Sequence, residues 1–208
     1  MRKFVLSGLI LGILCHVVAP SAKAGAVYTN GVVGGTIGAY NISSGFSVSD
    51  SFTLSGSSNL ISVDIGLWMA GGGSPLGLDW SIGSSAFGSN IAFGTAAFTN
   101  NTDLGPAPFA FELFLSSFDI NCPACSGSLW LTLSNGTGSA GTGQDLFWDQ
   151  NNGPSMAAQN PEGATISSES FTIFGNSVAA TPEPGSLLLL GTGLLGLGPF
   201  LRRRFVGS

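Results

Sequence analysis

Apolar residues alternate with small or polar ones in the stretch Ile61-Ser62-Val63-Asp64-Ile65-Gly66-Leu67-Trp68. Successive side chains of a β-strand point to opposite faces, so a period of two predicts a strand rather than a helix. One face of this strand carries the four apolar residues and is expected to pack against a core. The opposite face carries Asp64 and Trp68, which we expect to point outward.

The same alternation recurs along the chain. It appears at residues 46–54, where Asp50 interrupts an apolar face, and it repeats at Phe109, Phe111, Leu113 and Leu115 and at Leu129, Leu131 and Leu133. Further candidate strands cover residues 27–33, 36–42, 78–82, 91–98, 145–148 and 166–174. Short strands separated by turns rich in Gly, Ser, Asn and Pro predict an all-β domain, an antiparallel β-sandwich of jelly-roll type.

The charged residues are distributed unevenly. All six Lys and Arg lie near the two ends of the chain, and residues 25–181 contain no Lys, Arg or His but all of the eleven acidic residues except Glu183. This composition excludes a His-activated nucleophile, a Schiff-base lysine, a histidine metal site and an arginine phosphate clamp in that region. It also excludes nucleic acid as a partner, because affinity for phosphates requires basic side chains.

Both ends of the chain have the composition of targeting segments. Residues 1–24 combine basic Arg2 and Lys3, an apolar run and a small-residue cleavage site after Ala24, which predicts a signal peptide with a helical core. Residues 186–201 are almost wholly apolar and precede an arginine cluster. We expect residues 186–205 to hold a short transmembrane helix whose arginines stay in the cytoplasm, with the preceding domain outside the inner membrane.

The C-terminal order is specific. Pro182, Glu183 and Pro184 precede the apolar helix, and Arg202, Arg203 and Arg204 follow it. This order resembles the PEP-CTERM sorting signal, also known as the ice-binding protein C-terminal domain. The resemblance implies a protein exported across the inner membrane of a Gram-negative bacterium. It also implies an exosortase partner that recognises the Pro-Glu-Pro motif and removes the helix, and a place at the cell surface or in an exopolysaccharide or biofilm matrix.

The domain organisation follows from these segments. We expect a signal peptide at 1–24, a β-sandwich ectodomain at 25–176, a linker with the Pro-Glu-Pro motif at 177–185, and the membrane helix with its arginine cluster at 186–205. Residues 46–174, including the block Trp148 to Ser155, resemble an uncharacterised β-rich ectodomain frequent among PEP-CTERM proteins. That second resemblance implies the β fold and no particular activity.

Two cysteines remain after signal-peptide cleavage, Cys122 and Cys125. In an oxidising compartment this C-x-x-C pair favours a local disulfide, while free or metal-bound thiols and a redox role are the alternatives. A redox role requires a helix N-terminus to lower the thiol pKa, and the residues that follow have a strand pattern.

Oxygen ligands for a calcium ion are densest at Asp145, Asp149 and Asn151. Calcium binds carboxylates, amide oxygens and carbonyls, but the spacing does not match an EF-hand. Solvated loop residues are the alternative interpretation. We expect no other cofactor.

Two interpretations involve carbohydrate. Trp68 and Trp130, with Asp64 beside the first, form a candidate glycan-binding surface, because a flat indole stacks on a sugar ring and a carboxylate accepts its hydroxyl protons. Packing beneath a loop or a neighbouring strand is the alternative for both rings. A glycosidase needs only two carboxylates, for which Glu112, Glu162 and Glu169 are the candidates.

The sequence as a whole therefore favours a non-enzymatic exported protein with a structural or adhesive role in an exopolysaccharide or biofilm matrix. A carbohydrate-binding module and a glycoside hydrolase remain as alternatives.

Overall fold

The computed structural model describes residues 24–35, 38–139, 145–161 and 163–178. The chain divides into two units, Met1–Asn176 and Ser177–Ser208, and the first contains the β domain. The expected signal helix, the membrane helix and the sorting motif lie outside the described residues. Within the described ranges, no helix combines the length and the apolar character needed to cross a membrane.

The described part of the chain contains ten strands and one short 3-10 turn, Pro108–Ala110, but no α-helix. All strand pairs are antiparallel, so the prediction of an antiparallel all-β domain is confirmed. The strands are β1 (Gly25–Thr29), β2 (Ala39–Asn41), β3 (Ser47–Ala70), β4 (Pro75–Gly83), β5 (Ala92–Ala107), β6 (Phe111–Gly138), β7 (Leu146–Asp149), β8 (Ala157–Asn160), β9 (Ala164–Ile166) and β10 (Phe171–Ser177).

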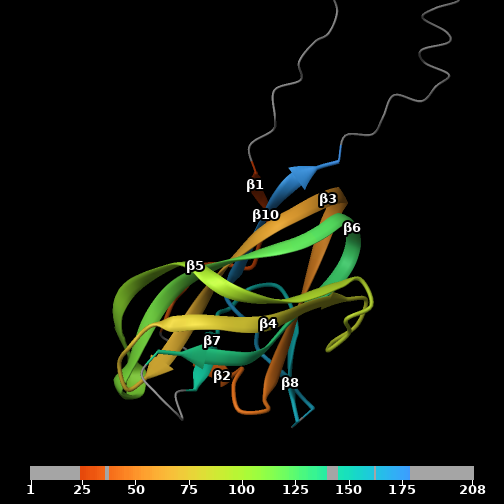
Figure 1. Cartoon of the computed structure of the whole chain (residues 1–208). Helices are drawn as coiled ribbons and strands as arrows, with labels where there is room; N and C mark the ends of the chain where they lie inside the picture. Colours follow the sequence, from red (N-terminus) through yellow and green to blue (C-terminus); the bar gives the residue numbers. More distant parts are fainter. Residues whose placement is uncertain (1–23, 36–37, 140–144, 162, 179–208) are drawn as a thin grey trace, which may run out of the picture. The chain divides into compact units, whose positions relative to one another are not determined.

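Two long strands form the centre of the domain. β3 and β6 pair from Ser47 opposite Ser134 to Ala70 opposite Phe111, and their register shifts between Leu54 and Ser62. The sequence predicted separate strands on each side of this region. Irregular pairing lets a strand bend without ending, and Figure 1 shows both ribbons bending near the top of the view.

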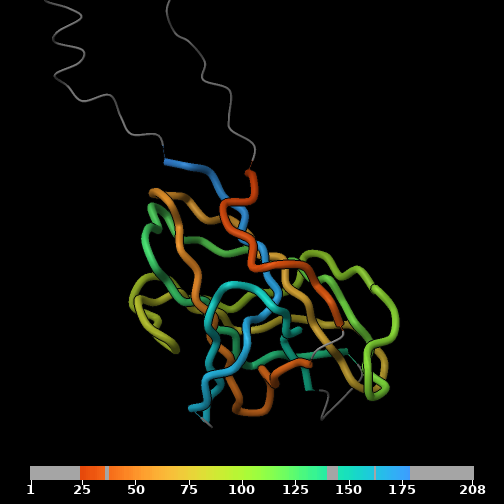
Figure 2. Tube along the Cα trace, turned by 180° about the vertical axis from the view of Figure 1, so that it is seen from behind, coloured from red at the N-terminus to blue at the C-terminus, as the bar shows by residue number. Residues whose placement is uncertain are grey.

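The other strands curl the sheet around these two. β4 pairs with the second half of β6, and β5 pairs with both β4 and the first half of β6. β4 and β5 therefore connect the two halves of β6 through continuous strand pairing (Figure 1). β7 and β8 pair with β3, and β10 lies between β3 and β1. In a β-sandwich the core lies between two separate sheets, whereas here all ten strands belong to one sheet that curls around the core. In Figure 2 the red β1 and the blue β10 run side by side.

The main core lies inside this curl. Leu129, Leu131 and Leu133 point into it and are at most 3 % exposed, as the alternation predicted. The large side chains of β3 and those of β10 complete the core, with Trp148 and Phe171 packed at a ring-centroid distance of 5.6 Å. The main core thus combines apolar residues from distant parts of the chain.

The expected core face of the first half of β6 is wrong. Phe114, and not Leu113, points into the main core, while Leu113 packs in a second, smaller apolar cluster with Trp68. Phe109 lies in the 3-10 turn with a φ of 61° and is 88 % exposed. Both faces of this segment are apolar and covered, so alternation alone does not select the side that faces the main core.

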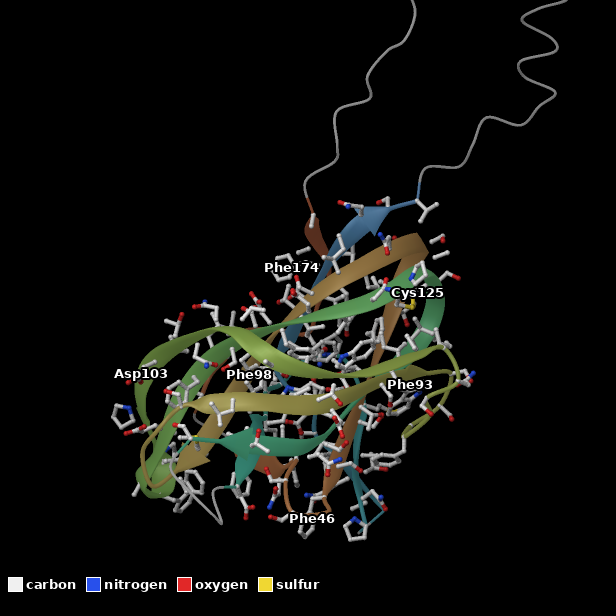
Figure 3. The ribbon with its side chains drawn as sticks, in the orientation of Figure 1. Phe46, Phe93, Phe98, Asp103, Cys125 and Phe174 are labelled. Atoms are coloured by element: carbon white, nitrogen blue, oxygen red, sulfur yellow. A yellow bond between two sulfur atoms is a disulfide. The ribbon has the colours of Figure 1, made fainter. Side chains whose placement is uncertain are left out.

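The structure joins Cys122 and Cys125 in a disulfide with a Cα–Cα distance of 5.8 Å. Both cysteines are buried, and Cys125 lies where β6 bends (Figure 3). The bond therefore closes a short loop within the irregular part of the β3–β6 pair.

Candidate functional site

Trp68 lies outside the main core, as predicted, but it is covered by a second apolar cluster and is not exposed. Its side chain is 3 % exposed, and its indole Nε1 donates a hydrogen bond to the Asp149 carboxylate at 2.6 Å. The ring of Phe111 lies 5.9 Å away between centroids. The second apolar cluster therefore covers this face of β3, and the indole is not accessible for stacking on a sugar.

The other two proposed glycan-binding residues do not complete a site with Trp68. Asp64 is partly buried and accepts a hydrogen bond from the Ser117 hydroxyl at 2.6 Å. Trp130 is also partly buried and pairs with Ser51 in the other half of β3. The three side chains belong to separate environments.

Asp149 is a structural carboxylate at the end of β7. It is fully buried, and it accepts four hydrogen bonds, from the backbone N–H groups of Gly34 and Gly35, the Trp68 indole and the Ser170 hydroxyl, at 2.6–3.1 Å. Gly66 permits this packing, because a Cβ at that position would lie 2.8 Å from the Cβ of Asp149. Asp149 thus ties the 30–35 segment and β3 to the segment before β10.

The residues proposed for calcium have separate protein partners. Asp145 accepts a hydrogen bond from the Ser44 hydroxyl at 2.7 Å, and the Asn151 side chain bonds Gly153, Ser168 and the Asn30 carbonyl. In the described parts of the chain, no three His, Cys, Asp or Glu side chains are grouped so that they could hold a metal ion.

Two further buried carboxyl groups, Asp50 and Glu169, lie next to this network. One oxygen of Asp50 accepts hydrogen bonds from the Glu169 backbone N–H at 2.6 Å and the Asn30 amide at 3.1 Å. The other Asp50 oxygen and both carboxylate oxygens of Glu169 are buried without a hydrogen-bond partner among the described residues. Burial raises the Asp50 pKa to about 6. Burial, and then the charges of Asp50 and Asp149, raise the Glu169 pKa well above its usual range.

The buried Glu169 carboxylate is unsuited to glycoside hydrolysis. Glu169 is fully buried and its oxygens are sealed from solvent, Glu112 is partly buried at the start of β6, and Glu162 lies outside the described residues. A hydrolase needs two carboxylates that flank a bond of the substrate in an accessible cleft. The described residues place no such pair at an open site.

Two of the surface pockets formed by the described residues are lined by polar side chains. The first, of about 330 Å³, lies between the loops 31–34 and 150–153. Gly34 and Asn151 line it, but the Gly34 N–H bonds the Asp149 carboxylate and the Asn151 side chain bonds its own neighbours. These two polar groups are therefore already engaged by the protein itself.

The second pocket, of about 410 Å³, lies on the outer face of β4, β5 and β6. Asp79 faces it between Thr95 and Ser134, its register partners on the two neighbouring strands. One Asp79 oxygen accepts a hydrogen bond from the Thr95 hydroxyl at 2.5 Å and the other accepts one from the Asn135 amide at 2.7 Å. These bonds, first that of Thr95, lower the Asp79 pKa. We refer to this site as the β4–β5 pocket.

Phe93 forms one side of the β4–β5 pocket and is 75 % exposed. It lies at the start of β5, and Asp103 lies toward the other end of the same strand (Figure 3). Sequence reasoning missed Phe93 and Asp79, although both lie on predicted strands. The missing information was the β4–β5 register, which brings residues 79, 81, 93 and 95 together on one outer face.

The comparisons with known proteins concern the C-terminus. Residues 180–204 match the PEP-CTERM protein-sorting motif, so the predicted resemblance is confirmed. A search of curated proteins found no match to the chain. The motif lies outside the described residues, and the β domain is not included in the match.

Proposed function

We propose that this chain, which carries a PEP-CTERM protein-sorting motif and is an exported protein, is a non-enzymatic component of an exopolysaccharide or biofilm matrix. The motif at residues 180–204 is the observation that carries the proposal. It indicates export and exosortase processing, and processing separates the β domain from its membrane segment. We propose that the domain then has a structural or adhesive role at the surface of a Gram-negative cell or in its matrix.

The composition and the burial of the acidic residues support a non-catalytic role. Residues 25–181 lack Lys, Arg and His, and two of the most strongly perturbed carboxyl groups, Asp50 and Glu169, are sealed inside the domain. Perturbed pKa values in an open cleft are typical of catalytic groups. In this domain the two raised pKa values belong to buried groups that pack its interior, whereas the pKa of Asp79 in the β4–β5 pocket is lowered.

The experiment compares the protein with a variant in the native host. Replacing Pro182, Glu183 and Pro184 by alanine is expected to abolish processing, so that the protein keeps residues 186–208 and stays with the membrane fraction. The wild-type protein is expected in the matrix fraction, with a mass that lacks residues 1–24 and the C-terminal helix. A double alanine variant at Ser177 and Val178 is the matched control.

Equal masses and equal fractions for the wild type and the motif variant would contradict exosortase processing. A correctly processed protein that is released into the medium and absent from the matrix would contradict the matrix role alone.

A second candidate function, a carbohydrate-binding module, is favoured by the β4–β5 pocket. As the candidate glycan-binding site, this pocket replaces the surface that the sequence predicted around Trp68. Both functions are compatible with an exported matrix protein, and the second adds a specific ligand.

A further inference from the structure

The outer face of β4 and β5 combines an exposed aromatic ring with an oriented carboxylate. We propose that the β4–β5 pocket binds a neutral polysaccharide, with Phe93 stacking on a sugar ring and Asp79 accepting hydrogen bonds from its hydroxyl groups. This inference rests on the proposed function, because it names the matrix partner of the exported domain.

Phe93 is presented to solvent by a regular strand. Thr95 and Ala97 lie on the same face of β5 as Phe93 and are also exposed. The alternating residues Ala92, Gly94 and Ala96 face inward and are partly buried. Phe93 makes no aromatic pair among the described residues. The ring is therefore available for stacking, and a flat apolar face suits the C–H face of a sugar.

Asp79 is oriented before any ligand arrives. Each of its oxygens accepts one hydrogen bond from a neighbouring side chain, and each carboxylate oxygen has a second lone-pair site for a ligand hydroxyl. These bonds favour the ionised form, which is the stronger acceptor. Ser81, Ser89 and Ser134 line the same pocket. The Ser81 hydroxyl donates to the Gly88 carbonyl at 3.0 Å and keeps its lone pairs as acceptors.

The charge of the domain selects the class of polysaccharide. No basic residue lies between residues 25 and 181, whereas the pocket itself contains an ionised carboxylate. A polymer of uronic acids or sulfated sugars would be repelled, and no cationic side chain of the domain offsets that repulsion. A neutral glycan meets no such penalty, and the pocket volume is in the range of small-ligand sites.

The test uses the processed protein isolated from its native host. The probes are dextran, a galactomannan and the deproteinised neutral polysaccharide of the host's own matrix, with alginate as the anionic probe. Binding is measured by the retardation of the native protein in gels that contain each polymer. We expect retardation by at least one neutral polymer and none by alginate.

Two variants locate the site. Phe93→Ala removes the stacking ring and is expected to weaken binding about tenfold, the upper range for an aromatic contact. Asp79→Asn keeps the shape of the side chain and is expected to weaken binding while leaving thermal stability nearly unchanged. Phe109→Ala is the matched control, because Phe109 is 88 % exposed at the far end of β5.

Retained binding in Phe93→Ala and Asp79→Asn would overturn the assignment of the pocket, as would equal losses in Phe109→Ala. Binding to none of the neutral polymers, or to alginate alone, would overturn the ligand class. None of these binding results changes the expected processing of the protein or its recovery in the matrix fraction. Failure of this inference is therefore distinguishable from failure of the proposed function.

Discussion

The buried carboxyl groups predict that the domain is more stable in mild acid than at neutral pH. Asp50 is fully buried, and its pKa is raised from its usual 3.8 to about 6 in the folded domain. A raised folded-state pKa means that the folded protein binds the proton more tightly than the unfolded chain. The contribution to stability is therefore fully present below pH 3.8 and is lost as the pH rises through about 6.

The size of the effect follows from the shift. One pKa unit corresponds to about 1.4 kcal/mol, so Asp50 alone lowers the free energy of unfolding by about 2.5 kcal/mol between pH 4 and pH 7.5. Glu169, whose pKa is also raised by burial and by its acidic neighbours, acts in the same direction.

The assay is urea unfolding followed by tryptophan fluorescence at pH 4, 5, 6 and 7.5. In Asp50→Asn the amide oxygen can still accept the hydrogen bonds from Glu169 and Asn30, so we expect a folded variant with a pH dependence about 2.5 kcal/mol smaller. Asp103→Asn, at an exposed position in β5, is the matched control and should leave the profile unchanged. A wild-type stability that is constant or rises from pH 4 to 7.5 would refute the reasoning, as would an unchanged profile in Asp50→Asn.

Three further outcomes are expected. Trp68→Phe removes the indole hydrogen bond to the buried Asp149 carboxylate and should lower the free energy of unfolding by about 2–3 kcal/mol in urea titrations. Trp130→Phe is the control, and a loss below about 1 kcal/mol in Trp68→Phe would contradict the role of that bond. Reduction of the Cys122–Cys125 bond should cost about 2 kcal/mol or less, because the closed loop is short, and a larger loss in melts with reductant would mean that the bond organises more than its own turn. Melting temperatures should rise with ionic strength as screening reduces carboxylate repulsion, equally in sodium, magnesium and calcium chloride, and a larger rise in calcium alone would identify a calcium site.

The sequence predicted the fold class because alternation is a local property. The run Leu129, Leu131 and Leu133 has one clearly apolar face, and that face lies in the main core. The lengths of β3 and β6 were missed for a physical reason, since the small and polar residues that resemble turns fall where irregular pairing bends the strands without ending them.

The sites were less predictable, because alternation tells which side chains share a face and not what covers that face. Trp68 shares the outer face of its strand with Asp64 as expected, but β7 and the second apolar cluster cover the indole. Asp50, which interrupts an apolar face in the sequence, is satisfied in part by Glu169, a residue of a distant segment. Such contacts depend on which strands pair, and period-two patterns carry no information on pairing.

The pairing of the first and last strands has a consequence for the order of assembly. A secreted chain crosses the membrane from its N-terminal end, so residues 25–29 arrive long before Thr172 and Gly175, which pair with Thr29 and Gly25. Because β10 lies between β1 and β3, the sheet stays incomplete until almost the whole domain has been translocated. The sorting motif starts at residue 180, soon after β10 ends at Ser177. Completion of the sheet and delivery of the sorting motif therefore nearly coincide, and a chain cut short before residue 171 has neither the complete sheet nor the sorting motif.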